Sequence, residues 1–469
     1  MVADRSLVLV STLLVLLLGY AFYVGLAETV SRDERVQELV LQQERKQSDT
    51  IETVKRIMSG QEKPDAFKNP LNPALVGSSL GGLYAIMPNS ALSPLALGQS
   101  DLLPNHYKIS NRNKTKFMYQ TENESPWNLL SGRFDPVFVL VYLFPLFVFA
   151  VSYNLLSSEK EQGTLRMQLS HPVTLQMLMF GKLLARMVPV LGVVILTLLL
   201  LFLIMRWDAV MPENTLHLIV AFIFILAYGL FWFALAFLIN SFGFSSASNA
   251  LILVGSWVFL VLVAPVLLNV FVSHVSPVPS RTQLATETRL VTIDGLNRYH
   301  ELLSSDYRHV QAPSMLIASN GKFEVPGRLK AFFLINKAVD EKIEVLLDDF
   351  ETSLRKQQDL VERFGFISPS ILTYEGLVSL AGTGTRRYQH FKQQVNDYHQ
   401  QWKDFFEPRI MSGEAMNVSD FRDLPRFSWQ ELDGHTLIVE SLAKVSQILL
   451  VAVLLLFFGF GRLSKTNVL

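Results

Sequence analysis

Six apolar runs, each long enough to cross a lipid bilayer, constrain this chain more than any other feature of its sequence. A membrane-spanning helix needs about 20 mostly apolar residues. The runs are Ser6–Ala27, Asp135–Leu155, Met187–Met205, Leu216–Ile239, Ala247–Val272 and Leu437–Phe460. Two long polar segments follow the first and the fifth of these runs. The sequence therefore predicts a mainly α-helical membrane protein with six spans and two large segments outside the bilayer.

The composition narrows the classes of function that this chain can have. Half of its residues are hydrophobic and 17% are charged, which is typical of spans combined with sizeable aqueous segments. The formal net charge is zero, so nothing indicates nucleic-acid binding. The absence of cysteine excludes disulfides and thiolate metal sites. Neither a phosphate-binding loop nor a metalloprotease or serine-hydrolase motif is present, so we expect no catalytic site, no metal site and no directly bound cofactor.

Basic residues near the ends of the runs predict the orientation of the chain. They are Arg5, Lys160, Arg166, Lys182, Arg186, Arg462 and Lys465, with Arg206 as the one contrary charge. The positive-inside rule makes their loops cytoplasmic, so both termini are expected inside and the two long segments outside. In a bacterial inner membrane the long segments would lie in the periplasm. The first run could be a signal peptide, but its length and the lack of a small-x-small cleavage site favour an uncleaved helix.

The predicted boundaries follow from these runs. They are a first span at 1–27, a first outer segment at 28–134, a second span at 135–156, a cytoplasmic loop at 157–186, spans three to five at 187–272, a second outer segment at 273–436, a sixth span at 437–461 and a tail at 462–469. The helix of the first span is expected to continue through Glu28–Ser59. The stretch Pro64–Pro104 has no helical period and predicts loops with short strands.

The second outer segment is expected to be mostly helical. Apolar residues recur at helical spacing in two stripes, Val339, Ile343, Leu346, Phe350 and Leu354, and Tyr388, Phe391, Val395, Tyr398, Trp402 and Phe405. These stripes predict an antiparallel helical pair, covered by a third helix at about Gln283–Ser304. The aromatic residues are either core or a surface on which a ligand stacks.

A short apolar helix is predicted between the two stripes, beginning at Pro369 and ending at Gly382 or Gly384. It is too short to span a membrane. It either lies in the outer membrane interface or docks on the first outer segment.

Glu440 and Lys444 form the one charged pair inside a predicted span. They are four residues apart, so they can pair on one face of a helix. Either they lie at the outer interface with their charges in water, or they line a translocation path or a contact between subunits.

The loop Ser157–Arg186 carries the most function-specific pattern in the chain. Gly163 permits a tight turn, and Thr164 can cap the N-terminus of a short helix. Glu159 and Glu161 precede this helix, where its dipole favours negative charge.

The short helix of this loop would present a small apolar knob to a partner. The knob consists of Leu165, Met167 and Leu169, and Pro172 would end the helix. Lys182 marks the beginning of the next span at the inner surface.

This loop resembles the cytoplasmic loop of ABC-2 type transporter permeases, in which E-x-E-x-GTL-x-x-LLS-x-P is followed by GK-x-L. The counterparts are Glu159, Glu161, Gly163, Thr164, Leu165, Leu169, Ser170, Pro172, Gly181, Lys182 and Leu183. Gln168 departs from the pattern, because the family more often has leucine there. The segments PWNLLSGRFDPVFVLVYLFPL and SPLALGQSDL resemble a subgroup with large outer segments, so the resemblance covers nearly the whole chain.

The resemblance implies a type V exporter-like architecture and a permease subunit without its own nucleotide site. A separate cytoplasmic ABC ATPase, in two copies, would bind ATP and magnesium and dock on Glu159–Lys182. A second permease subunit, identical or related, would complete the transporter. Family members usually begin with a basic amphipathic helix, whereas only MVADR precedes the first run, so the loop is expected to carry most of the ATPase contact.

Spans two and five usually form the seam between the two halves of such transporters. The resemblance makes Asn249, Ser256 and Asn269 candidates for the seam or the path, unless they are hydrogen-bonded within their own bundle. Two functions remain open. The protein either couples ATP hydrolysis to export or mechanical work in the envelope, or is a receptor or scaffold whose outer segments bind a ligand or an envelope partner.

Overall fold

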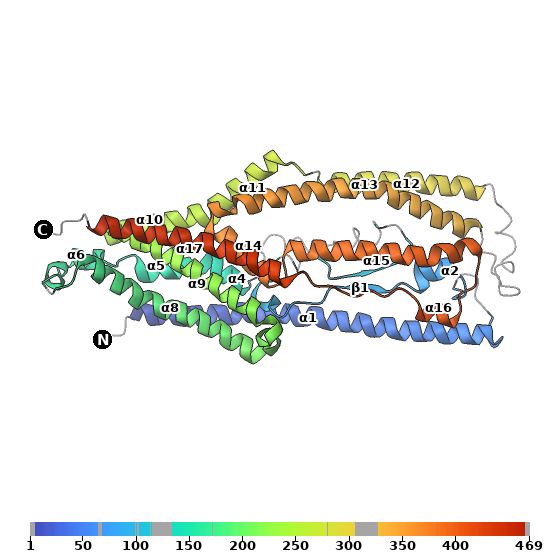
Figure 1. The fold of residues 1–469 in the computed structure, drawn as a ribbon, viewed down its shortest axis with the longest axis horizontal. Helices are drawn as coiled ribbons and strands as arrows, with labels where there is room; N and C mark the ends of the chain where they lie inside the picture. Colours follow the sequence, from blue (N-terminus) through green and yellow to red (C-terminus); the bar gives the residue numbers. More distant parts are fainter. Residues whose placement is uncertain are drawn as a thin grey trace.

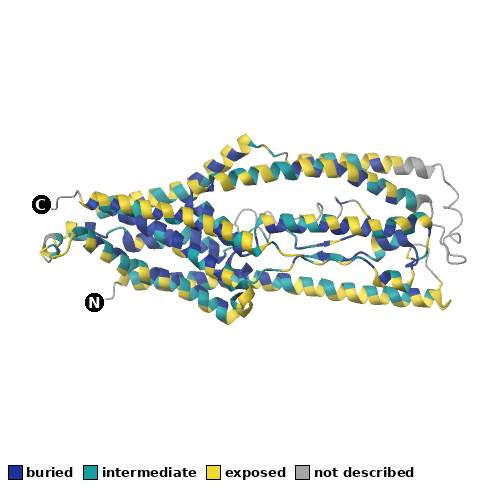
Figure 2. Ribbon diagram, viewed as in Figure 1, coloured by how far each residue is buried: buried dark blue, intermediate teal, exposed yellow. Residues whose placement is uncertain are grey.

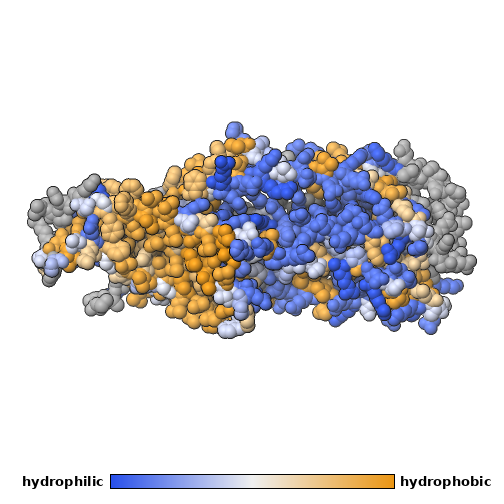
Figure 3. Space-filling view, viewed as in Figure 1, coloured by the Kyte–Doolittle hydropathy of each residue, from blue (hydrophilic) through white to orange (hydrophobic). Residues whose placement is uncertain are grey.

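The structure is a computed structural model that describes residues 5–63, 68–98, 100, 103–112, 114, 134–170, 172–278, 280–304 and 327–464. The molecule is elongated, and the beginning of α1 (Arg5–Met58) lies on the same side as the end of α17 (Gly434–Ser464) (Figure 1). Its surface divides into an apolar half on the side of the termini and a polar half (Figure 3). Lys465 and segment 115–133, which carries most of the PWNLLSGRFDP motif, lie outside the described residues, as does the side chain of Arg166.

Six helices of the described ranges are long and apolar enough to cross a membrane, which confirms the predicted fold class. In chain order they are span one, α1 (Arg5–Met58); span two, made of α4 (Pro136–Phe138), η4 (Val139–Leu143), α5 (Phe144–Ser152) and α6 (Ser157–Glu161); span three, α8 (Leu175–Met205); span four, α9 (Pro212–Ser241); span five, made of α10 (Ser246–Trp257), η6 (Val258–Val263) and α11 (Ala264–Val275); and span six, α17 (Gly434–Ser464). Together they form the apolar half, here called the bundle.

Span four lies at the centre of the bundle. It packs against α5, α8, α14 and α17, and 67% of its apolar window is buried, the largest share among the six spans of the described ranges. Trp232, Phe233 and Phe237 of α9 are fully buried, and Figure 2 shows a dark blue core within the bundle.

The first polar segment begins as a direct continuation of span one. Helix α1 has 54 residues without a break, about 80 Å at 1.5 Å per residue, so it leaves the bundle and runs along the polar half. The short elements α2 (Pro73–Leu75), η1 (Val76–Leu80), β1 (Tyr84–Ile86), η2 (Ser93–Leu95) and β2 (His106–Lys108) follow it. The two strands pair antiparallel, with Ala85 opposite Tyr107.

The second polar segment is helical, as predicted, but its two stripes do not face each other. The segment consists of α12 (Arg281–Ser304), α13 (Gly327–Phe364), η9 (Gly365–Ile367), α14 (Pro369–Leu380), α15 (Thr385–Ser412) and α16 (Val418–Arg422). The stripe of α13 packs against α12, and the aromatic stripe of α15 packs against the first polar segment. Polar contacts join α13 to α15 instead, among them the ion pair of Lys337 with Glu407 at 2.8 Å.

The aromatic stripe of α15 is core. Phe391, Val395 and Trp402 are 0% exposed and pack with residues of α1, β1 and β2. Phe406 rather than Phe405 is the fully buried phenylalanine near the end of the stripe. Both spacings from Trp402 fit a helix, so the sequence period alone could not separate them.

Helix α14 is buried against the bundle at the boundary of the two halves. It contacts α9 and α17, and a Cβ at Gly376 would lie 2.2 Å from the Phe224 ring of α9. It also reaches the first polar segment, because a Cβ at Gly98 would lie 2.8 Å from Val378. Gly382 follows the helix with a φ of 69°, a conformation that favours glycine.

Candidate functional site

The loop between spans two and three folds into two short helices, α6 and α7 (Leu165–Gln168). Gly163 separates them with a φ of 73°, which a residue with a Cβ adopts only at a cost. Thr164 occupies the N-cap position of α7, but its side chain makes no cap hydrogen bond. Its hydroxyl instead contacts the carbonyl oxygen of Glu159 at 3.4 Å.

Charged side chains hold this loop against span three, the beginning of span five and the connection between spans four and five. Lys182 of α8 forms an ion pair with Glu159. Glu161 accepts hydrogen bonds from the backbone nitrogen and the hydroxyl of Ser246, at 2.7 and 3.0 Å. The Lys160 Nζ donates to the carbonyl oxygen of Gly243 at 3.0 Å. The loop that joins spans two and three thus also holds the beginning of span five.

The expected position of the two acidic residues needs a correction. The sequence placed both at the N-terminus of the short helix that follows them. The structure pairs Glu159 with Lys182 and puts Glu161 at the N-terminus of α10, where the carboxylate satisfies an otherwise unpaired helix N–H. Sequence spacing could not show this, because Glu161 and Ser246 are 85 residues apart.

The apolar knob also differs from the prediction. Met167 is 76% exposed, whereas Leu165 packs against the bundle core and Leu169 is half-buried. Other apolar side chains at this end of the molecule are exposed, and sequence reasoning missed them: Val173, Met177, Phe242 and Phe244. The rings of Phe242 and Phe244 are stacked, with centroids 5.8 Å apart.

Span five contains a backbone irregularity that a side chain of the polar half satisfies. At the end of the π-helical turn η6, the N–H of Ala264 bonds to the carbonyl oxygen of Phe259, five residues back, and the next residue in that pattern is Pro265. Because proline has no N–H, the carbonyl oxygen of Leu260 loses its donor. The hydroxyls of Ser368 and Ser370 donate to it instead, at 2.5 and 3.2 Å. The buried turn before α14 is therefore clamped to span five.

Span two has the same irregularity. Pro145 lies two residues after η4, and side chains of neighbouring spans donate to two carbonyl oxygens of this turn. The Tyr228 hydroxyl donates to the carbonyl oxygen of Val141 at 2.8 Å, and the Trp257 indole donates to that of Tyr142 at 3.1 Å. Spans four and five thereby contact the irregular turn of span two.

The predicted polar residues of the spans lie in different places. Asn249 is 0% exposed and donates to Asn240 at 3.2 Å within the bundle. The Ser256 hydroxyl donates to the carbonyl oxygen of Ile252 in its own helix. Asn269, Glu440 and Lys444 line one cavity at the boundary between the bundle and the polar half.

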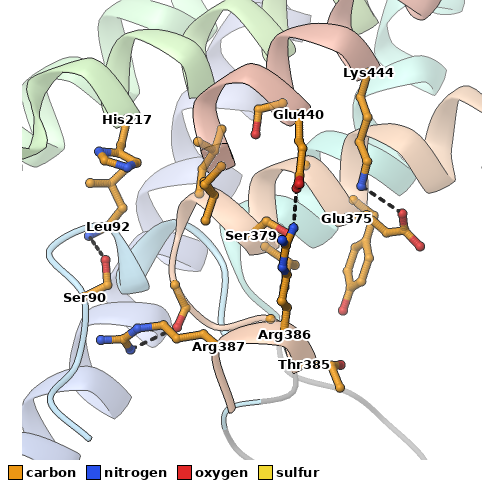
Figure 4. Close-up of a pocket in the computed structure, with 18 of the residues that line it drawn as sticks. Ser90, Leu92, His217, Glu375, Ser379, Thr385, Arg386, Arg387, Glu440 and Lys444 are labelled. Carbon is orange, nitrogen blue, oxygen red and sulfur yellow. Dashed lines mark hydrogen bonds and ion pairs between the residues drawn. The ribbon is translucent and has the colours of Figure 1, made fainter. Parts of the chain in front are cut away.

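This cavity has a volume of about 740 Å³ and wraps around α14. Apolar residues of spans two and five, Val141 and Val261, line it together with Leu437 of α17. Charged residues of α14, α15 and α17 line it as well. Figure 4 shows how they point toward one another across the cavity. Among the described residues, no group of three or more His, Asp or Glu side chains could hold a metal ion.

Three ion pairs bridge the elements around the cavity. Arg386 of α15 pairs with Glu440, and Lys444 pairs with Glu375 of α14 at 3.3 Å. The spacing of Glu440 and Lys444 had indicated that they pair with each other. The structure shows that they do not, because each pairs with an opposite charge from the polar half. Burial raises the pKa of Glu375, and Lys444 opposes this shift.

The third pair joins Arg387 to Glu431 through two hydrogen bonds, of 2.8 and 2.6 Å. Burial alone would raise the pKa of Glu431, but the hydrogen bonds from Arg387 and Trp429 hold it below its ordinary value.

The comparisons with known proteins agree with this architecture. Residues 1–323 match the family described as ABC-2 family transporter protein, and residues 328–430 match Domain of unknown function (DUF3526). No curated protein and no solved structure matches the chain. The first match covers 323 of 469 residues, well over half of the chain. The chain therefore belongs to the ABC-2 family of transporter proteins.

Proposed function

We propose that this permease couples ATP hydrolysis by a separate ABC ATPase to export or to mechanical work in the bacterial envelope. Family membership implies an ATPase partner and embedding in a membrane. The chain has no phosphate-binding loop of its own, so ATP and magnesium would be held by the partner. Two ATPase copies and a second permease, identical or related, would complete the transporter.

The observation that carries this proposal is the fastening of the loop 157–186 to several spans. A force on α7 would pass through the Glu159–Lys182 ion pair to span three and through the bonds between Glu161 and Ser246 to span five. A loop held in this way cannot move without moving the ends of these helices. The exposed Met167 offers a partner a first point of contact.

The same force has a route to the polar half. Span five leads from Ser246 to the Leu260 carbonyl, where Ser368 and Ser370 hold the beginning of α14. Helix α14 in turn is joined to span six by the pair of Glu375 with Lys444. We infer that motion at the loop shifts α14 and the helices attached to it, which is the physical content of coupling.

The proposed orientation places the loop in the cytoplasm and the polar half in the periplasm. Helix α6, the beginning of α8 and the end of α17 lie toward the end that carries the loop (Figure 1). These segments contain Lys160, Lys182, Arg186 and Arg462, in agreement with the positive-inside rule. The polar half would then accept a substrate or contact an envelope partner.

The substitution Met167→Asp tests the proposal without disturbing the fold. The Met167 side chain is 76% exposed, so a carboxylate there costs the isolated permease little. It would place an unpaired charge in an interface that needs an apolar contact. We expect the tagged full-length chain, purified from its native membrane, to lose at least about tenfold of its co-purified ABC ATPase.

Met58→Asp is the matched control, because Met58 is 61% exposed at the far end of α1. It should leave ATPase recovery unchanged. If the Met167→Asp chain retained its ATPase, or if the wild-type chain carried no ABC ATPase, the receptor or scaffold function would replace this proposal.

A further inference from the structure

The cavity around α14 lies at the depth where the bundle surface meets the polar half. Its apolar lining comes from the spans, through Val141, Val261 and Leu437. Val439 and Leu442 flank Glu440 on α17 and are 53% and 41% exposed, so in a bilayer they would face lipid. In a bilayer the cavity would therefore open beside the headgroup layer, where phospholipid headgroups are abundant.

Two ion pairs in this cavity place charges of alternating sign side by side, and Asp208, Glu362, Arg387 and Glu431 also line the cavity. Glu440 and Lys444 stand one turn apart on α17, and each faces an opposite charge, Arg386 and Glu375. The outer pair is about half exposed, with side-chain exposures of 55% and 47%. The inner pair is largely buried, at 19% and 25%. The four side chains form a charge quartet that is neutral as a whole.

A neutral quartet restricts the kind of headgroup that can enter. A partly buried charge that loses its partner is strongly destabilising. An anionic headgroup that took Lys444 would leave Glu375 unpaired, and a cationic one would leave Lys444 unpaired. A zwitterionic headgroup replaces both partners at once, its phosphate meeting the cation and its ammonium the carboxylate.

We propose that this cavity is a binding site for the headgroup of a zwitterionic phospholipid, with the first part of the acyl chains on the apolar lining. A volume of about 740 Å³ lies within the usual range of ligand sites, about 300–1,000 Å³. The site would fasten a lipid between α14 and span six. It does not depend on an ATPase partner, so it stands or falls separately from the proposed function.

The experiment uses the purified full-length chain in detergent. Bound lipid is counted by native mass spectrometry during titration with phosphatidylethanolamine or phosphatidylglycerol, and soluble phosphoethanolamine is added as competitor. We expect phosphatidylethanolamine to bind at least about tenfold more tightly than phosphatidylglycerol, and phosphoethanolamine to compete poorly because it lacks the apolar part. Equal binding of both lipids, or competition by phosphoethanolamine as strong as by the lipid, would overturn the assignment.

Two variants separate this site from general lipid adhesion. Glu375→Gln leaves Lys444 without its anion, so the preference should turn toward phosphatidylglycerol. A loss of folding cannot produce such an inversion. Glu375→Gln combined with Lys444→Met leaves only the more exposed pair of Arg386 with Glu440, so the preference between the two lipids should weaken. The control, Lys337→Met with Glu407→Gln, removes a remote ion pair and should bind both lipids as the wild type does. Unchanged lipid selectivity in both quartet variants would contradict the proposal.

Discussion

The clamp between the polar half and span five yields a quantitative prediction. Ser368→Ala with Ser370→Ala removes both hydroxyl donors to the Leu260 carbonyl oxygen. Both serines are buried, at 0% and 3% exposure, so water cannot easily replace them. Pro265 has no N–H to offer. An unsatisfied buried carbonyl costs about 1–3 kcal/mol, and we expect this loss in the free energy of opening α14 from the bundle.

Hydrogen exchange of the α14 amides measures this opening directly. A loss of about 1–3 kcal/mol corresponds to exchange about 5- to 150-fold faster in α14, with little change in the core of α9. Ser256→Ala is the control, because its hydroxyl contacts a carbonyl of its own helix. The reasoning is refuted if α14 exchanges at the wild-type rate in the double variant, or if the control accelerates it as much.

A second substitution tests the proposed cause. Pro265→Ala restores an N–H at the position that the irregular turn lacks. The Leu260 carbonyl then has a backbone donor, so the serine substitutions should cost less in that background. A cost that is unchanged by Pro265→Ala would show that the serines act in another way.

Further predictions concern the polar half and α14. Burial, reinforced by Lys403 and Lys114, lowers the pKa of His399 to about 3 from its ordinary value of 6.5. The imidazole of the unfolded chain takes up a proton below about pH 6.5, whereas that of the folded chain does not. The free energy of unfolding should therefore fall by about 1.4 kcal/mol per pH unit between pH 6.5 and pH 3. In thermal unfolding measured against pH, the His399→Gln variant should lose this dependence. Gly376→Ala should destabilise the protein by about 1–3 kcal/mol, because the new Cβ would overlap the buried Phe224 ring. Gly255 has open space around it, so Gly255→Ala should not destabilise the protein. Equal unfolding midpoints of the two variants would disprove this reasoning.

The spans and the helical character of the polar half could be predicted from the sequence because they depend on local composition and period. About 20 apolar residues suffice to predict a span. The aromatic period of α15 likewise indicates a buried face, and Pro369 and Gly382 mark the limits of α14. What covers each face depends on contacts between distant segments, so the packing of the two stripes was predicted incorrectly.

The candidate site, too, could be predicted from the sequence only in part. The turn at Gly163 follows from local chemistry. The partners of Glu161, Glu440 and Lys444 do not, because they lie 85, 54 and 69 residues away in the chain. The burial of Ser368 against a membrane span follows from its hydrogen bond to the Leu260 carbonyl in the irregular turn of span five, a contact that the sequence pattern does not reveal.

The central claim is that motion at the loop reaches the polar half, and a distance measurement tests it most directly. The chain has no cysteine, so spin labels can be placed at Met58→Cys on α1 and Leu290→Cys on α12, both 61% exposed. Electron–electron resonance on the complex with its ATPase would compare the nucleotide-free and ATP-bound states. We expect the distance distribution to shift with ATP and the shift to vanish in the Met167→Asp background. A distribution that ignores ATP while the ATPase is bound and active would contradict the account.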